Sequence, residues 1–130
     1  MSELTCLELS VVMWLAHVLV QASFGNVELP FGYLFTSRDK PTAASGLLFG
    51  RATRALANYV ENFTPFVAVA LALIVTQRTG GSGALGATIW ILARIVYIPL
   101  YLFGLVYVRT AVWAISIGGL LMMLSRLVGW

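Results

Sequence analysis

Four long apolar runs dominate this sequence, and each is long enough to cross a lipid bilayer as a helix. The first extends from Leu7 to Phe24, and the third, from Ala84 to Val108, contains Arg94 as its only charged residue. About 20 apolar residues are needed to span a hydrocarbon core of about 30 Å. Only 10% of the residues are charged and 60% are hydrophobic, whereas soluble domains carry about 25% charged residues. We therefore expect an all-α membrane protein, and we exclude a soluble domain and a disordered chain.

The sequence contains no internal repeat and no domain boundary. We therefore expect a single four-helix transmembrane domain over residues 1–130. Prolines and glycines around Pro30 and Pro41 mark the long first loop, and Thr79–Gly83 is a short flexible turn. The expected helices cover residues 4–25, 44–77, 84–107 and 109–128.

Basic residues outside the spans indicate how this bundle is oriented. With four spans, both termini lie on one side of the membrane. The first loop, the start of helix two and the third loop hold five basic residues, whereas the opposite side holds two: Arg38, Lys40, Arg51, Arg54 and Arg109 against Arg78 and Arg126. Lys and Arg concentrate in cytoplasmic loops. We therefore expect both termini to lie on the non-cytoplasmic side.

Helix two carries four polar residues on one face. Arg51, Arg54, Asn58 and Glu61 are spaced by three, four and three residues, which is helical periodicity. Charged residues within a span are costly and usually functional. This pattern indicates a binding site, and the alternative is a structural polar seam whose arginines reach out to lipid headgroups.

Helix three carries a second polar stripe, formed by Arg94, Tyr97 and Tyr101. An unpaired arginine near mid-span costs at least ~2.5–3.5 kcal/mol. Glu61 is the only carboxylate in the interior of a span, and it lies within ~6 Å of Arg94 in depth. We therefore predict an Arg94–Glu61 ion pair that joins helix three to helix two.

A few further residues have structural interpretations. His17 is expected to be a hydrogen-bonded packing residue. Three tryptophans near span ends are expected to anchor the chain at the membrane interface: Trp90, Trp113 and Trp130. Gly118–Gly119 is expected to permit close helix packing. With one cysteine and one histidine, no metal site is expected, and the small net charge predicts no nucleic-acid partner.

The two polar stripes resemble the MAPEG family, the membrane-associated proteins of eicosanoid and glutathione metabolism. Arg51–Phe66 fills the family pattern R-x-x-R-A-x-x-N-x-x-E, followed four residues later by P-F. Ala93–Tyr101 resembles A-R-x-x-[HY]-x-x-x-Y, and Arg109–Thr110 stands where family enzymes place an Arg-Ser pair. The resemblance covers nearly the whole chain and is closest to the bacterial members.

This resemblance implies a homotrimer with sites between subunits that open toward the cytoplasm, in a bacterial inner membrane. It implies glutathione as cosubstrate and a lipophilic small molecule, arriving through the membrane lipids, as the second substrate. Arg94 matches the partner of the glutamate in helix two. Other positions match residues that line the glutathione pocket: Arg54, Asn58, Glu61, Tyr97 and Tyr101, with Arg51 beside them.

Catalysis on glutathione would need its thiolate, because the thiol is a poor nucleophile. Arg109 is the best candidate to stabilise a thiolate, since it is expected to open helix four shortly after Tyr101. Tyr101 or Thr110 is expected to donate a second hydrogen bond to the sulfur. The alternative for Arg109 is a positively charged anchor at the cytoplasmic membrane edge.

Three functions remain open at this stage. The leading hypothesis is a glutathione-dependent transferase or peroxidase-like membrane enzyme. The second is a non-catalytic MAPEG-fold subunit or lipid-binding protein. The third is a small multidrug-type transporter, but that class uses a membrane glutamate in its first helix, and here Glu8 lies only at the edge of helix one.

Overall fold

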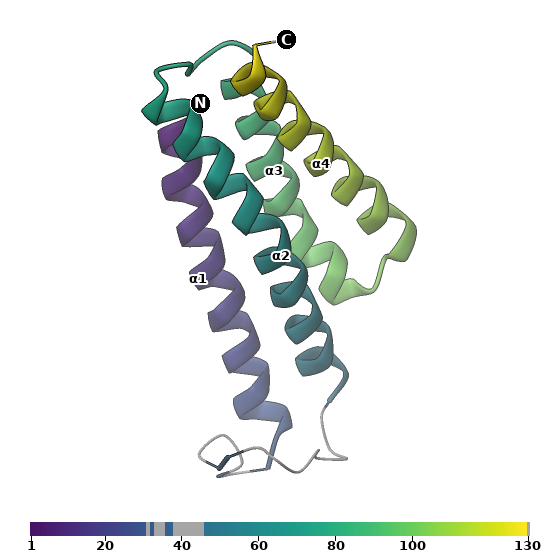
Figure 1. The fold of residues 1–130 in the computed structure, drawn as a ribbon. Helices are drawn as coiled ribbons and strands as arrows, with labels where there is room; N and C mark the ends of the chain where they lie inside the picture. Colours follow the sequence, from purple (N-terminus) through teal and green to yellow (C-terminus); the bar gives the residue numbers. More distant parts are fainter. Residues whose placement is uncertain (31, 33–35, 38–45, 130) are drawn as a thin grey trace.

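Four helices build the protein in the computed structural model, which describes residues 1–30, 32, 36–37 and 46–129. They are α1 (Glu3–Glu28), α2 (Leu47–Val75), α3 (Ser82–Phe103) and α4 (Val106–Val128), arranged as a bundle (Figure 1). Each is long and apolar enough to span a membrane. The predicted all-α, four-helix membrane architecture is confirmed, and the chain is an integral multi-pass membrane protein.

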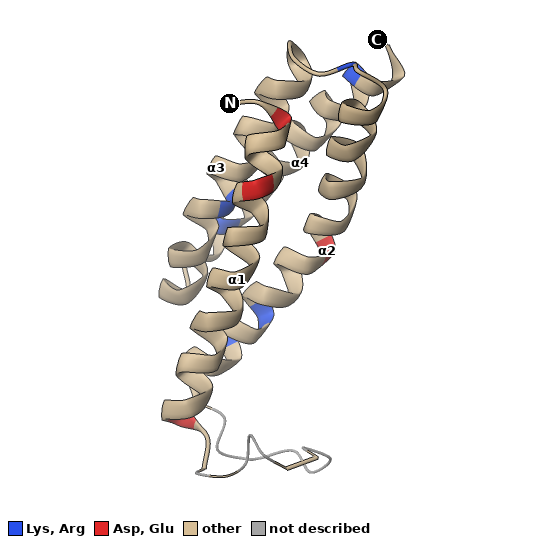
Figure 2. Ribbon diagram, turned by 90° about the vertical axis from the view of Figure 1, so that its left-hand side faces the viewer, with Lys and Arg blue, Asp and Glu red and all other residues tan. Residues whose placement is uncertain are grey.

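Both termini lie at one end of the bundle, together with the α2–α3 turn, whereas α1 and α2 extend beyond the α3–α4 turn at the other end (Figure 1). Charged residues are sparse along all four helices (Figure 2). Some of the sequence-based predictions fall outside the described residues: those for Arg38, Lys40, Pro41, the start of the second helix at 44–45 and Trp130.

The α3–α4 connection is tighter than the sequence indicated. Helix α3 ends at Phe103, four residues before the expected end, because Gly104 adopts a left-handed conformation with φ of 76°. The Gly104 N–H donates to the Tyr101 carbonyl at 3.2 Å, and the Leu105 N–H donates to the Leu100 carbonyl at 3.1 Å. These two bonds form a Schellman cap. Helix α4 consequently begins at Val106, so that Arg109 lies within its first turn.

Aromatic rings fill the core between α1, α2 and α3. Trp90 is fully buried and stacks on Phe66 with ring centroids 3.9 Å apart. Tyr59, also fully buried, packs against Trp90 and donates a 2.6 Å hydrogen bond to the Ser10 carbonyl. The prediction that Trp90 anchors the chain at the membrane interface is wrong, because its helical face points toward α2.

A pair of glycines lets α3 and α4 approach closely. A Cβ atom added to Gly119 would lie 2.6 Å from the backbone oxygen of Gly86, closer than side-chain atoms can approach. The neighbouring Gly118 has nothing within 4 Å. The predicted close packing is therefore confirmed for Gly119 and is absent at Gly118 within the described chain.

Candidate functional site

A pocket of about 270 Å³ opens between α2, α3 and α4. Four residues from the predicted site line it together, one from α2, two from α3 and one from α4. Thr110 and Trp113 complete the wall, and the full lining is Asn58, Tyr97, Tyr101, Arg109, Thr110 and Trp113. One residue of the α2 stripe, two residues of the α3 stripe and Arg109 thus converge on one volume, although Asn58 and Arg109 are 51 positions apart in the chain.

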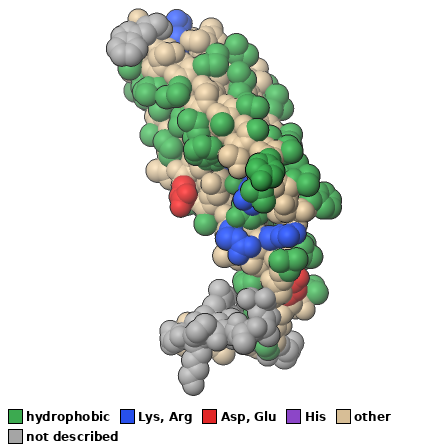
Figure 3. Space-filling model, turned by 90° about the vertical axis from the view of Figure 1, so that its right-hand side faces the viewer, with side chains coloured by type: hydrophobic (Ala, Val, Ile, Leu, Met, Phe, Trp, Pro, Cys, Tyr) green, Lys and Arg blue, Asp and Glu red, His purple; other side chains and the backbone are tan. Residues whose placement is uncertain are grey.

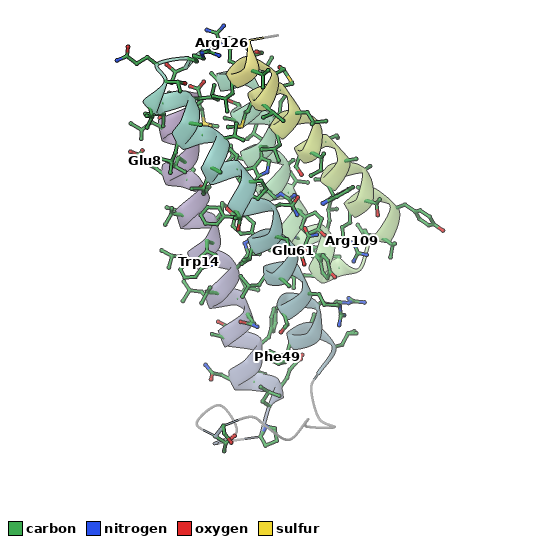
Figure 4. All side chains as sticks on the ribbon, in the orientation of Figure 1. Glu8, Trp14, Phe49, Glu61, Arg109 and Arg126 are labelled. Atoms are coloured by element: carbon green, nitrogen blue, oxygen red, sulfur yellow. The ribbon has the colours of Figure 1, made fainter. Side chains whose placement is uncertain are left out.

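The tight α3–α4 turn positions the aromatic and cationic wall of the pocket. Tyr97 and Tyr101 are one helical turn apart on α3, with ring centroids at 5.6 Å. The Arg109 guanidinium carbon lies 4.3 Å from the Tyr101 ring centroid, which is cation–π distance. Figure 4 shows Arg109 at the end of α4 that joins α3. The turn therefore places a cation and a phenol side by side at the pocket.

Arg94 lies behind the residues that line the pocket and is almost completely buried, with 1% of its surface exposed. It donates to Asn58 Oδ1 at 2.9 Å and to Ser116 Oγ at 2.8 Å. Its guanidinium carbon also lies 5.6 Å from the Trp90 ring centroid and 5.3 Å from that of Tyr97. One arginine on α3 thereby joins α2 and α4.

The predicted Arg94–Glu61 ion pair is wrong within the chain. Glu61 is exposed on α2, and the hydrogen bonds of Arg94 go to neutral side chains. The reason is geometric: three residues along a helix turn through about 300°, so Glu61 is rotated about 60° away from Asn58. Asn58 faces α3, and Glu61 therefore lies toward the outer surface of the bundle.

The two arginines at the start of α2 lie outside the pocket of the single chain. Arg51 donates to the Leu102 carbonyl at 2.7 Å, and so helps to terminate α3. Arg54 is exposed and makes no hydrogen bond within the described part of the chain. Basic side chains gather in one band of an otherwise largely hydrophobic face, in the half of the bundle away from the termini (Figure 3).

Two residues of the site were missed by sequence reasoning. Trp113 lies one turn after Arg109 on α4, and Ser116 lies seven residues after it, so both share its helical face. The spacing was available in the sequence. A serine in an apolar helix carries no signal by itself, however, because it satisfies its own hydroxyl with a backbone carbonyl.

His17 is confirmed as a hydrogen-bonded packing residue. It is buried, and its Nδ1–H donates to the Met13 carbonyl at 2.8 Å. Its ring packs on Tyr59 with centroids 4.3 Å apart. His17 therefore belongs to the core on the far side of Tyr59 and does not line the pocket.

Four membrane-spanning helices enclose a polar pocket between three of them. This arrangement defines the class as a multi-pass membrane protein with a candidate binding pocket. The MAPEG family model matches residues 5–129, and the chain belongs to the MAPEG family. Comparisons with curated proteins and with solved structures gave no match. MAPEG proteins generally use glutathione and are generally trimers.

Proposed function

We propose that this protein is a glutathione-dependent membrane enzyme that acts as a transferase, or as a peroxidase-like enzyme, on a lipophilic substrate. One observation carries the proposal. In a MAPEG chain, the pocket brings Asn58, Tyr97, Tyr101 and Arg109 to one volume at the end of the bundle away from the termini. That volume offers donors for an anionic ligand beside two aromatic rings.

The charges of the site suit glutathione, which carries two carboxylates and one ammonium group at neutral pH. Arginine binds carboxylates through paired hydrogen bonds, and Arg54 has no competing hydrogen bond within the described residues. Because Arg94 uses Asn58 and Ser116, both oxygens of Glu61 are left for the ammonium group. Arg51 lies beside this site and holds the end of α3.

The exposed polar face of α2 supports a homotrimer with sites between subunits. Arg54 and Glu61 are exposed on a helix that spans the membrane. Charged side chains that face lipid are costly, and in membrane proteins they face the bundle interior or a cavity. A neighbouring subunit packed over this face would remove both from lipid and close the pocket. We propose that this end of the bundle faces the cytoplasm of a bacterial inner membrane.

The chemistry at sulfur needs a cation and a hydrogen-bond donor. Arg109 supplies the cation that stabilises the thiolate, which then attacks the lipophilic substrate. The thiol proton passes to water when the thiolate forms. The new bond then forms from the sulfur lone pair, and the leaving group departs with the electrons of the broken bond. Thr110 donates its hydroxyl proton to the Val106 carbonyl at 2.9 Å. The hydroxyl of Tyr101 makes no hydrogen bond within the described residues, so Tyr101 is the donor that we assign to the sulfur.

Calorimetry of the purified protein in lipid nanodiscs tests this proposal. We expect saturable binding of glutathione at or below millimolar concentration, and turnover of a chloronitrobenzene electrophile. Asn58→Ala should weaken binding, whereas Asn26→Ala, on an exposed position of α1, should not. No binding to the folded wild-type protein at millimolar glutathione would reject the enzyme and favour a non-catalytic, lipid-binding subunit.

A further inference from the structure

Three side chains from three different helices form one continuous chain of hydrogen bonds behind the pocket. Ser116 on α4 contacts Arg94 on α3 at 2.8 Å, and Arg94 contacts Asn58 on α2 at 2.9 Å. Ser116 and Arg94 are both at least 99% buried. Only Asn58 lines the pocket. Ser116 is therefore linked to the Asn58 side of the pocket through Arg94.

The direction of each hydrogen bond in this chain is set by chemistry. A guanidinium group has five N–H donors and no acceptor, so the Ser116 oxygen must accept from Arg94. The proton of the Ser116 hydroxyl is directed elsewhere, since Oγ lies 2.7 Å from the carbonyl oxygen of Trp113 and donates to it. The hydroxyl is thus held with a lone pair toward Arg94.

The same argument sets the orientation of the Asn58 amide. Because Arg94 can only donate, the atom of Asn58 that faces it must be Oδ1. The amide nitrogen Nδ2 then points away from Arg94. Within the described part of the chain Nδ2 has no hydrogen-bond partner, and Asn58 is only partly buried. Its two N–H groups are therefore free to meet a ligand in the pocket.

We propose that Ser116 is a positioning residue, which holds Arg94 so that Asn58 presents N–H donors to the pocket. Beside Asn58, the pocket then favours a ligand that carries a hydrogen-bond acceptor, such as a carboxylate or carbonyl oxygen. The identification of that ligand as glutathione rests on the proposed function. The orientation of the Asn58 amide does not.

Ser116 has a large share in holding Arg94, because the guanidinium has few other restraints. Its Nε–H is buried without a hydrogen-bond partner among the described residues, so the bonds to Asn58 and Ser116 hold the group together with its contacts to two aromatic rings. Removing the Ser116 hydroxyl leaves Nη2 as a second guanidinium nitrogen without an acceptor. The guanidinium must then move to find one, and the Asn58 amide loses its fixed orientation.

Nuclear magnetic resonance of the ligand-free protein tests the orientation directly. The sequence contains three asparagines, Asn26, Asn58 and Asn62, so ¹⁵N-asparagine labelling gives a short set of side-chain amide signals. We expect Ser116→Ala to shift and broaden the Asn58 Nδ2 signals while those of Asn26 stay in place. Unchanged Asn58 signals in folded Ser116→Ala protein would overturn the proposal.

A matched control separates positioning from general packing. Ser10 on α1 is also fully buried and also donates to a carbonyl three residues earlier, at 2.6 Å, but none of the described arginines contacts it. Ser10→Ala should leave the Asn58 signals unchanged, and equal shifts in both variants would count against the proposal. Ser116→Thr, which keeps the hydroxyl, should restore the wild-type signals. If Ser116→Ala does not fold, Ser116→Cys, with its weaker acceptor, should show the same shift.

Binding measurements then connect the orientation to the ligand. We expect Ser116→Ala to raise the Kd and KM for glutathione about tenfold, with kcat at saturating glutathione nearly unchanged. In an Asn58→Ala background the same change should have no further effect on Kd. An equal, additive loss in that background would show that Ser116 does not act through Asn58. If the wild-type protein bound no glutathione, the proposed function would be rejected. The Asn58 signals would still test the positioning role of Ser116, because they are measured without ligand.

Discussion

Arg94 donates a 2.9 Å hydrogen bond to the side-chain oxygen of Asn58, and this contact places a buried guanidinium directly behind a residue that lines the pocket. Hydrogen bonds to neutral side chains solvate its charge in place of a carboxylate. If Asn58 binds the ligand as proposed, stability and ligand recognition depend on the same bond.

The first prediction concerns this bond. Arg94→Met should lower the free energy of unfolding by about 1–3 kcal/mol, because it leaves the Asn58 oxygen without its donor. Adding Asn58→Leu should recover much of that loss, since replacing both partners by apolar groups can be nearly neutral. Unfolding in a detergent titration measures the cycle. The losses in free energy of unfolding caused by Glu61→Gln and Arg94→Met should be additive. Strong coupling between these two positions would indicate that Arg94 and Glu61 form an ion pair after all.

Two adjacent glycines on α4 give a second, internally controlled prediction. Gly119→Ala should destabilise the bundle by about 1–3 kcal/mol, because the added Cβ would lie 2.6 Å from the Gly86 oxygen. Gly118→Ala should change stability by less than about 1 kcal/mol, since nothing lies within 4 Å of that position. Thermal unfolding of the two variants provides the comparison. Equal melting temperatures would mean that α3 and α4 do not meet at Gly119.

The third prediction separates the two arginines at the start of α2. Arg54→Ala should weaken glutathione binding at least about tenfold, because a hydrogen bond to a charged group contributes about 1.5–3 kcal/mol. Its thermal stability should be retained, since Arg54 makes no hydrogen bond within the described chain. Arg51→Ala should lower the melting temperature instead, because Arg51 binds the Leu102 carbonyl. Calorimetry and thermal unfolding on both variants test this division, and unchanged affinity in Arg54→Ala would refute it.

The fourth prediction concerns Arg109. If it stabilises the thiolate, Arg109→Ala should slow turnover by about 10²-fold, with glutathione affinity nearly retained. The pH–rate profile should move upward, toward the free thiol pKa of about 8.5, because the thiolate form loses its cation. Arg126→Ala, at the opposite end of the bundle, is the control and should leave the rate and the profile unchanged. Unaltered turnover by purified, folded Arg109→Ala protein would reject the catalytic role and favour the alternative, in which Arg109 only anchors α4 at the membrane edge.

The fifth prediction concerns orientation in the membrane. In a Cys6→Ala background, a cysteine at Ser37 in the first loop should resist an impermeant thiol reagent in intact cells. A cysteine at Ser82, the first residue of α3, should react. The physical basis is the five-to-two excess of basic residues on the side of the first loop. Labelling at Ser37 from outside the cell would invert the topology.

Composition and periodicity alone determined the architecture of this protein. Four long apolar runs in a chain with 10% charged residues favour membrane helices, because lipid requires every backbone group to be hydrogen-bonded and a helix satisfies its own groups. Helical spacing also placed Asn58 on one face of α2, and Tyr97 and Tyr101 on one face of α3. Membership of a family was visible in the same spacing and is confirmed by the match to residues 5–129.

Tertiary structure decided which of these faces meet. Periodicity assigns a residue to a side of its own helix, but the rotation of that helix in the bundle depends on packing, here the stacking of Trp90 on Phe66 and the close approach of Gly86 and Gly119. A rotation of about 60° separates Asn58 from Glu61. Because of this rotation, Arg94 donates to the Asn58 amide and the Ser116 hydroxyl, and the Glu61 carboxylate lies on the outer surface. Spacing and charge along the sequence do not predict which of these groups faces Arg94.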